Sequence, residues 1–551
     1  MFIRGASIRL TVALALTSVT LFVTSAYGQS SATPPDSPGN EVAAAQGSQL
    51  SNPGKKFLPE KPRPIELEDK VAAVMADNAA VREQLRKMEE QQRALLELVD
   101  RLQRRLEGSP VAEVSRPAQP PGPAEAAEDL ALSTPEAGAT LSLPPATPAQ
   151  ATATDDRYNE GIVLAETSED AKIPFQLKFT NIAQFRYLNT LASNDTFTDH
   201  LGNVRPVSKR NDLTVNREMF TFAGYIFDKR LTFGLFAWTS ATTTQVVVSG
   251  NVSWRFNKAI TLNSGYWAVP GSRTLTFTFP YFTQPERSLA DNFFRPGFTQ
   301  GIWFTGEPVK GLNYDVFIGD GLNTLTIPVS KIDTHLAYAV SVWWEPLGPF
   351  GPEGKSRNMY DDYFPSKKPV IRVGTSYTRS REDRFTNLDQ SNPENTSMHN
   401  SDGVLTFSTG AFAPGVTLDK ATYRMSAIDG GIKWQGLAVN GQYYFRWVND
   451  FVADGPLPIS STFDHGGELS ASYFVVPKKW MLYGRTSGIF GQFGNSSEYA
   501  GGFKWYFVPT QRVWLQGEAL RIYKSSYGST ITPYTAGMTG WAPVVQTIFS
   551  F

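Results

Sequence analysis

The sequence predicts an all-β protein, an antiparallel transmembrane β-barrel of about 16 strands preceded by an α-helical coiled coil. Three observations carry this prediction. Aromatic residues make up 13% of the chain, and yet the mean hydropathy is mildly negative at -0.26. From residue 156 onward, apolar and polar residues alternate in segments of about ten residues, separated by turn residues. Before residue 156, a heptad seam lies between two Pro- and Ala-rich segments.

Residues 1–28 have the features of a secretory signal peptide. Arg4 and Arg9 precede an apolar stretch at 10–23, and small residues follow at its end. No other apolar run reaches about 18 residues, which excludes an α-helical membrane protein. The chain contains 0 cysteines, so disulfides cannot stabilise it, and its net charge of -1 argues against a nucleic-acid partner.

Residues 65–108 are predicted to form a coiled coil between two linkers, 29–64 and 109–155, that are too rich in Pro, Ala and Ser to fold. Apolar residues step by four and three without a break from Leu67 to Leu106, with Asn78 and Gln92 at two a positions. A stripe this narrow requires a partner helix, most simply another copy of the chain. The alternative is a single amphipathic helix lying on another domain. Peptidoglycan or another periplasmic component is a further candidate partner for this segment.

The barrel domain is expected at 156–551, with both ends of the chain in the periplasm. The predicted strands are 176–187, 213–227, 231–239, 245–256, 260–269, 300–307, 312–319, 335–345, 370–379, 424–434, 438–449, 466–474, 480–490, 499–507, 513–523 and 540–551.

The lengths of the joins between these strands support one orientation. Membrane barrels have short turns on the periplasmic side and longer loops outside. The joins after even-numbered strands are short, except for 346–369, which could conceal an extra hairpin. Every join after an odd-numbered strand is longer, apart from 241–244. The chain is therefore expected in the outer membrane of a diderm bacterium, in contact with lipid, with the coiled coil in the periplasm.

Alternation also assigns side chains to the two faces of the wall. In the strand 245–256, Val246, Val248 and Val252 fall on one face, and Ser249 and Arg255 fall on the other. A charged side chain that faces lipid costs about 2 to 4 kcal/mol, so charges within such a pattern should face the lumen. The predicted pore-wall residues are Lys178, Arg186, Arg217, Arg255, Arg372, Asp429, Lys433, Arg446, Arg485 and Lys504.

The segment 265–307 contains a stretch too irregular to be a strand, and this stretch carries Arg273, Arg287 and Arg295. Guanidinium groups offer forked donors that suit phosphate or carboxylate groups, and several in sequence could pass an anion along. These three arginines are therefore the candidate constriction. The structural alternative is that they hold the segment in place, for example through a pair between Arg287 and Glu286 or Asp429.

Other classes of function have weaker support in the sequence. The histidines His200, His335, His399 and His465 are dispersed and lack the spacing of metal ligands, so no metal, cofactor or enzymatic activity is expected. A Ser/His lipase site is not ruled out by the residues. Asp228, Asp361 and Asp362 have the setting of solvated turn acids. A second role is structural, with the barrel as the anchor of an envelope tether formed by the coiled coil.

Several motifs resemble the phosphate-selective porin O/P family, over most of residues 158–551. They are Gly265 to Pro270, Glu286-Arg287-Ser288, Gly301-Ile302 with Gly306-Glu307, Gly311-Leu312 with Tyr314, Lys433-Trp434 to Gly436, and Gly441 to Arg446. Trp541, Phe549 and Phe551 alternate at the end of the chain, as in the final strand of outer-membrane porins.

This resemblance implies a 16-stranded trimeric porin whose third external loop folds inward and narrows a channel for small solutes, with basic side chains guiding anions such as phosphate. Family members often have a lysine two residues before the motif proline Pro270, where this chain has Ala268. That departure weakens the expectation of strict phosphate selectivity and leaves the expectation of a porin intact.

Overall fold

The computed structural model describes most of the chain after residue 157. The described residues are 158, 160–239, 246–276, 279–324, 327, 332, 335–351, 360–388 and 397–551. The predicted signal peptide (1–28), the linkers (29–64 and 109–155) and the coiled coil (65–108) lie outside the described residues, and they stay predictions.

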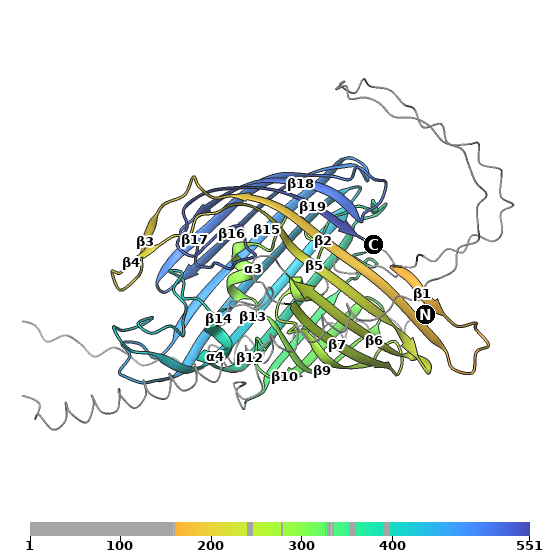
Figure 1. Ribbon diagram of the computed structural model, residues 1–551, viewed down its shortest axis with the longest axis horizontal. Helices are drawn as coiled ribbons and strands as arrows, with labels where there is room; N and C mark the ends of the chain where they lie inside the picture. The colour runs from red at the N-terminus through yellow and green to blue at the C-terminus, as the bar shows by residue number, and fades with distance from the viewer. Residues whose placement is uncertain are drawn as a thin grey trace, which may run out of the picture. The chain divides into compact units, whose positions relative to one another are not determined.

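The described strands form a closed antiparallel barrel of sixteen strands, as predicted (Figure 1). Each barrel strand pairs with the next, and β19 pairs with β2, with Gln546 opposite Arg186, which closes the sheet. The strands are β2 (Phe175–Asn189), β5 (Asn211–Ile226), β6 (Asp228–Thr239), β7 (Val246–Arg255), β8 (Thr261–Ala268), β9 (Phe298–Val309), β10 (Leu312–Gly319), β11 (Ala337–Trp344), β12 (Val370–Asp383), β13 (Leu418–Trp434), β14 (Leu437–Ala453), β15 (Thr462–Val476), β16 (Trp480–Gly491), β17 (Gly494–Trp505), β18 (Val513–Tyr523) and β19 (Gly540–Ser550).

Short elements lie outside the barrel wall. Strand β1 (Ile162–Glu166) pairs with the start of β2, and β3 (Thr196–Thr198) pairs with β4 (Val204–Pro206) in a separate hairpin. The described helical turns are η1 (Arg273–Leu275), α3 (Leu289–Phe294) and α4 (Arg384–Leu388). Within the described part of the chain, no helix has the length and apolar character needed to cross a membrane.

The two faces of the wall follow the predicted alternation. On β7, Val246, Val248 and Val252 are 65%, 65% and 53% exposed on the outside, whereas Ser249 on the inner face is 7% exposed. Apolar side chains stand exposed on the other strands too, for example Phe304 on β9 and Tyr499 on β17. The outer surface therefore presents apolar side chains to its surroundings, as a lipid-facing wall does.

The two ends of the barrel differ in the length of their joins. One end, called here the short-join end, carries the tight turns β5–β6, β7–β8, β9–β10 and β13–β14, together with the start of β2 and the end of β19. The opposite, long-join end carries the β3–β4 hairpin and the join 384–417 between β12 and β13 (Figure 1). One expectation about this end is wrong, because only Gln492 and Phe493 separate β16 from β17. Strand β17 begins at Gly494, whose positive φ of 152° suits the hairpin turn.

The long join 345–369 at the short-join end conceals no strand in its described parts, 345–351 and 360–369. Its residues 350–351 and 360–363 are buried, among them Phe350, Tyr360 and Tyr363, whereas most of 346–349 and 364–369 are exposed. It follows that this join is long because it packs inside the wall, and not because it forms another hairpin. It is called the return segment below.

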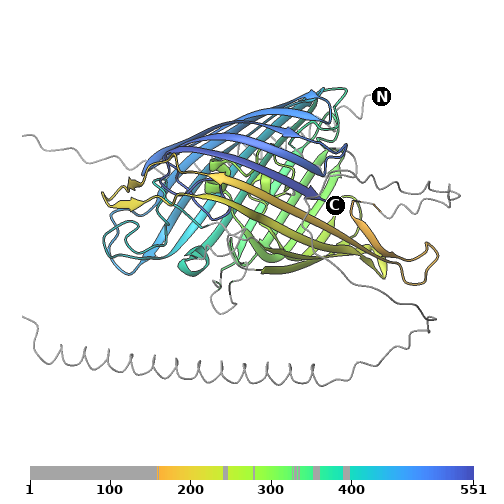
Figure 2. The same cartoon turned by 45° about the horizontal axis from the view of Figure 1, so that its top comes forward.

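The core of the molecule lies inside the barrel. Helix α3 packs against β14, β15 and β16, and Phe294 stacks on Tyr444 with ring centroids 5.1 Å apart. The turned view in Figure 2 shows α3 enclosed by the strands. The largest cluster of buried apolar side chains surrounds it and includes Phe293, Tyr527 and Met538. A large part of the lumen is therefore filled by protein.

Candidate functional site

The join between β8 and β9, residues 269–297, crosses the lumen and is called the inward segment. Its described residues bond to inner side chains on several strands: Gln184 on β2 donates to the oxygen of Pro285, and Gln516 on β18 donates to that of Thr283 at 2.9 Å. The hydroxyl of Tyr444 on β14 donates to Asp291 at 2.8 Å. These contacts fix the segment from several sides of the barrel.

A short helix with a side-chain cap holds the middle of the inward segment. Ser288 is the N-cap of α3, and its hydroxyl accepts a hydrogen bond from the backbone N–H of Asp291 at 3.0 Å. At the other end of the helix, Arg446 donates to the oxygen of Phe293 at 2.9 Å. The polar backbone groups at both ends of this buried helix thus have partners, as burial requires.

Glu286 is the centre of a buried ion cluster, called here the Glu286 cluster, that also contains Arg186, Arg217 and Arg287. Its Oε2 lies 2.7 Å from Arg217 Nη1 and 3.6 Å from Arg186 Nη2, and Oε1 lies 3.8 Å from Arg287 Nη1. Burial alone would raise the pKa of Glu286, but the neighbouring guanidinium groups outweigh it and hold the pKa at about 2. The cluster therefore fastens the inward segment to β2 and β5.

Arg273 lies on the other side of the inward segment and contacts the return segment. Its Nη2 donates to Asn440 on β14 at 2.9 Å, and its guanidinium stands 5.1 Å from the ring of Phe350 and 4.4 Å from that of Tyr360. Arg295 bonds within its own segment, to Asn292 at 3.3 Å. Of the three candidate arginines, only Arg287 is among the residues that line the cavity described below.

Asp361 joins the two segments inside the barrel, which corrects the expectation that Asp361 and Asp362 are solvated turn acids. It accepts hydrogen bonds from Thr283 of the inward segment at 2.7 Å and from Lys504 on β17 at 2.8 Å. Asp362 is buried as well, and it accepts from the backbone N–H of Gly436 at 2.7 Å. The return segment is thus an integral part of the filled lumen. Asp228, in contrast, is a turn acid as expected and pairs with Arg230.

Most predicted wall charges face inward but are bound to other groups. Arg186, Arg217, Arg372, Asp429, Lys433, Arg446, Arg485 and Lys504 are all buried. The closest pairs beyond those above are Arg372 with Asp429 at 2.8 Å, Arg446 with Asp464 at 2.8 Å, and Arg485 with Glu498 at 3.0 Å and Glu518 at 2.9 Å. Lys433 donates to the oxygen of Phe350 at 2.7 Å.

Two predicted wall residues differ from these. Arg255 on β7 is exposed at the short-join end and lines the cavity. Lys178 on β2 is half-buried and pairs in register with Ala223 of β5. The predicted pore-wall residues therefore form two groups. Most are buried and stabilise the part of the lumen that is filled by protein, whereas Arg255 and Lys178 are accessible to water.

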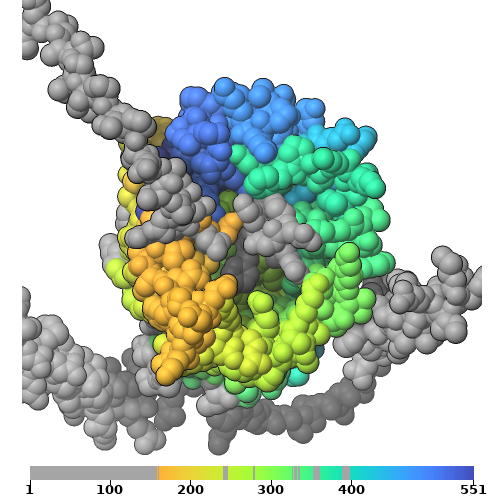
Figure 3. Space-filling model, turned by 90° about the vertical axis from the view of Figure 1, so that its right-hand side faces the viewer, coloured from red at the N-terminus to blue at the C-terminus, as the bar shows by residue number. Residues whose placement is uncertain are grey.

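An open cavity of about 1290 Å³ remains along the wall from β2 through β11. It is bounded by inner side chains of these strands on one side and by Thr274, Thr276 and Arg287 of the inward segment on the other. It reaches from Lys258, in the turn at the short-join end, to Ala268 at the far end of β8. From the short-join end, a hollow is visible beside the yellow-green and green strands (Figure 3).

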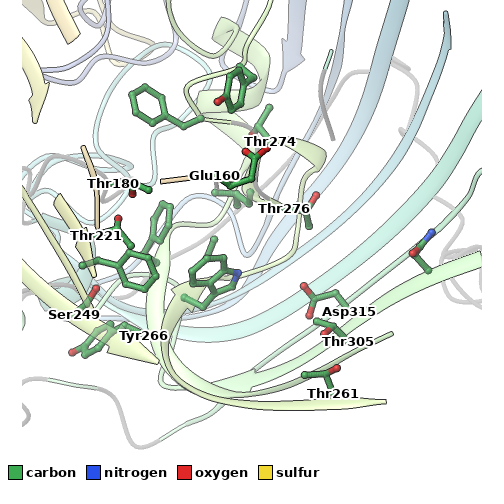
Figure 4. A pocket seen from close by; sticks show the side chains of 18 of the residues that line it. Glu160, Thr180, Thr221, Ser249, Thr261, Tyr266, Thr274, Thr276, Thr305 and Asp315 are labelled. Atoms are coloured by element: carbon green, nitrogen blue, oxygen red, sulfur yellow. The ribbon is translucent and has the colours of Figure 1, made fainter. Parts of the chain in front are cut away.

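The cavity wall combines hydroxyl groups with aromatic rings. Figure 4 shows the side chains of Thr180, Thr221 and Ser249 on one wall, with Asp315 and Thr305 close together on another part of the lining. Phe236, Trp238, Tyr266, Trp267, Phe279, Tyr281, Phe298 and Trp343 also line it.

Gly265 explains why consecutive residues of β8 reach this cavity. Its φ of 133° is a conformation that side-chain-bearing residues rarely adopt, and a Cβ there would lie 2.2 Å from the oxygen of Gly250. Pairing of β8 with β7 ends at Gly265, while pairing with β9 continues to Ala268. The strand departs from strict alternation here, so Tyr266 and Trp267 both line the lumen.

Sequence reasoning missed the acidic partners Asp464, Glu498 and Glu518, and it missed the aromatic character of the cavity. The alternation places the acids on the inner face, which is a signal that could have found them. No local pattern reveals which base each acid meets. Aromatic residues in a barrel sequence are usually assigned to the girdles at the two membrane interfaces. The sequence alone therefore does not show which of them line the lumen.

No protein-family model and no curated protein matches the sequence, so the resemblance to the phosphate-selective porin O/P family stays a prediction. OmpT of Vibrio cholerae is a similar solved structure, with 10% identity, 70% of this chain and 100% of that chain covered, and a TM-score of 0.43. An anion-selective porin from Comamonas acidovorans has 12% identity, 68% and 100% coverage, and a TM-score of 0.42. OprB of Pseudomonas putida has 10% identity, 68% and 94% coverage, and a TM-score of 0.41. Likenesses at this level carry no conclusion about what this chain does.

Proposed function

We propose that this chain is an outer-membrane porin, a water-filled channel through which small solutes diffuse passively. The observation that carries the proposal is the cavity that extends from Lys258 to Ala268 along the inside of a closed barrel. The apolar outer surface supports a location in lipid, and the different join lengths at the two ends support a periplasmic short-join end. The inward segment narrows the channel to one side of the lumen.

The proposed channel prefers anions weakly. Arg255 lines the open side and is exposed, and Asp315 is an acid on another part of the lining. Arg287 also lines the cavity, but it is buried in the Glu286 cluster. The other cavity charges lie in close pairs, such as Lys258 with Glu307 at 3.0 Å and Arg512 with Glu160 at 2.5 Å. Because the remaining wall arginines are bound to carboxylates, they hold the filled side together and contribute little to the field that a passing ion meets. This pattern favours a modest preference over strict phosphate selectivity.

Planar-bilayer recording tests the proposal. The purified protein should conduct steadily, and a KCl gradient should give a reversal potential that indicates a small preference for chloride. Arg255→Gln should move that potential towards zero without abolishing conductance, since Arg255 is exposed in the cavity. A phosphate gradient should give no stronger preference than chloride. A barrel that does not conduct, or one that strongly prefers cations, contradicts the proposal.

The heptad seam supports a second proposed role, in assembly or attachment. A homotrimer held by the coiled coil is the proposed assembly, and an envelope tether anchored by the barrel is the alternative. Deleting residues 66–107 separates the two: loss of the oligomer assigns the coil to assembly, whereas loss of envelope attachment with unchanged conductance assigns it to tethering.

A further inference from the structure

A stack of aromatic rings stands on the cavity wall. Trp267 stacks on Trp303 with ring centroids 5.9 Å apart and an angle of 13° between the planes, and Trp303 packs on Phe317 at 6.0 Å. Phe236 lies 5.9 Å from Trp267 on the other side. Trp303 and Phe317 are buried, whereas Phe236 and Trp267 are half-buried and line the cavity. Two buried rings thus support two rings whose surfaces reach the lumen.

Hydroxyl groups flank these rings. Thr221 pairs in register with Phe236, and Ser249 pairs with Phe236 from the other neighbouring strand, so both lie beside this ring on the inner face. Across the cavity, the inward segment presents Thr274 and Thr276. A solute that touches the aromatic faces would therefore also meet groups that can both donate and accept hydrogen bonds.

The charges on the lining disfavour a strongly charged ligand. Arg287 lies on the inward segment, and Asp315 lies on β10 with an Oδ1 atom that accepts no hydrogen bond within the described residues. Arg287 is already opposed by Glu286 at 3.8 Å and by Asp291 at 3.7 Å, so an anion finds little uncompensated positive charge there to offset the cost of leaving water. A neutral solute with hydroxyl groups meets no such penalty, and it supplies donors suited to a carboxylate.

We propose that this cavity is a stacking site for uncharged, hydroxylated ring solutes, the chemical class of carbohydrates. One face of a sugar ring exposes C–H groups that pack on Phe236 and Trp267, while its rim of hydroxyls meets Thr221 and Ser249. Asp315 lies on another part of the lining, where a longer saccharide would meet it. Each contact of this kind is weak, and several follow one another along the wall. A solute can therefore enter, move along the channel and leave. The inference rests on the proposed channel function, and it names a class of solute for it.

Block of ion current by a sugar tests this inference. Maltotriose added over a millimolar range should reduce the single-channel conductance in a saturable way, and more strongly than sorbitol at equal hydroxyl concentration, because sorbitol has no ring. Steady ion conductance with no greater block by maltotriose than by sorbitol overturns the stacking site while the channel proposal stands. Absence of ion conductance overturns the channel proposal itself. Block by benzoate but not by maltotriose also overturns the inference, because it assigns the cavity to aromatic acids.

Matched substitutions locate the site. Phe236→Leu and Trp267→Leu keep an apolar side chain and remove the flat ring, so each should raise the half-blocking concentration of maltotriose about threefold to tenfold while the channel still conducts. Phe304→Leu makes the same change on the outer face of β9, where the ring is exposed away from the lumen. It should leave the half-blocking concentration unchanged. Equal effects of the inner and outer substitutions contradict the proposal.

Discussion

Arg217 Nη1 on strand β5 lies 2.7 Å from Glu286 Oε2 on the inward segment, and both side chains are fully enclosed by protein. The pair connects the barrel wall to the inward segment, where Gln184 and Arg186 of β2 also donate hydrogen bonds to the oxygen of Pro285 at 3.3 and 3.1 Å. Arg186 adds a second guanidinium at 3.6 Å from the same oxygen. The Glu286 carboxylate is therefore a charged contact among the several hydrogen bonds that hold the inward segment in place.

Glu286→Gln should destabilise the inward segment strongly. The substitution keeps the shape of the side chain but leaves Arg186 and Arg217 buried without an opposing charge, a change that costs about 3 to 5 kcal/mol. The free energy of unfolding in denaturant should fall by that amount, and single-channel records should become noisier. Asp228→Asn removes the acid of an exposed turn pair and should do neither. Equal stability of Glu286→Gln and the unchanged protein would contradict the role of the cluster.

Acidification should loosen the join 384–417 before it loosens the Glu286 cluster. Burial lowers the pKa of His399 from 6.5 to about 4, so between these values the unfolded join binds a proton that the folded one does not, and the join loses stability as the pH falls. The pKa of Glu286 is held at about 2, below its usual 4.5. Its contribution is fully present above pH 4.5 and is lost only as the pH falls through about 2.

Hydrogen exchange at pH 7, 5 and 4 measures this order, after correction for the intrinsic pH dependence of exchange. Exchange in the described residues 397–417 should rise towards pH 4, while exchange in α3 should stay low. His399→Gln should flatten the pH dependence of the join. If exchange rose in both residues 397–417 and helix α3 near pH 5, the assignment of the pH response to His399 would be wrong.

Arg273→Ala should release the return segment and enlarge the open path. Arg273 lies between the rings of Phe350 and Tyr360 and bonds to Asn440, and loss of such buried charge-assisted contacts costs about 1.5 to 3 kcal/mol. We expect higher and less steady conductance with little change in ion preference, because Arg273 does not line the cavity. Arg255→Gln is the matched control and should give the opposite pattern. A change in reversal potential alone for Arg273→Ala would identify it as a pore-lining charge.

A disulfide should join the two segments inside the lumen. The hydroxyl of Thr283 donates to Asp361 at 2.7 Å, and the natural chain has 0 cysteines to interfere. The double variant Thr283→Cys with Asp361→Cys should cross-link on oxidation, which is visible as a shift in electrophoretic mobility after proteolysis between the two positions. Either single variant serves as the control. Failure to cross-link in a folded, conducting barrel would show that the return segment does not meet the inward segment.

The barrel could be predicted from the sequence because its signals are local. Alternation identified every barrel strand, and the inward orientation of Arg217, Arg372 and Arg485 followed from the same parity and the cost of a charge in lipid. The strand ends were less clear, since β13 and β14 continue through polar residues beyond the predicted bounds. Turn residues and join lengths correctly distinguished the two ends of the barrel. The exception is the tight turn between β16 and β17, which lies at the long-join end.

The partner of each charged side chain in the lumen could not be predicted from the sequence, because the partners lie on segments that are far apart in the chain. Asp361 and Lys504 are 143 residues apart in the chain, and nothing local to either one indicates their pairing. The same holds for Glu286 and Arg217, which are 69 residues apart. Basic residues facing the lumen were therefore interpreted as anion guides, whereas acids from other strands and from two inward-packed joins bind most of them.

The central claim is that solutes pass only on the side of the lumen lined by β2 to β11. Thr221→Cys places a thiol on the cavity wall, and Ser472→Cys places one on β15, where Ser472 is buried and bonds to Asp361 at 3.2 Å. The measurement is single-channel current before and after addition of a bulky, water-soluble methanethiosulfonate reagent. The account predicts a lasting drop in current for Thr221→Cys and none for Ser472→Cys. Block at Ser472→Cys with an unaffected Thr221→Cys would contradict it.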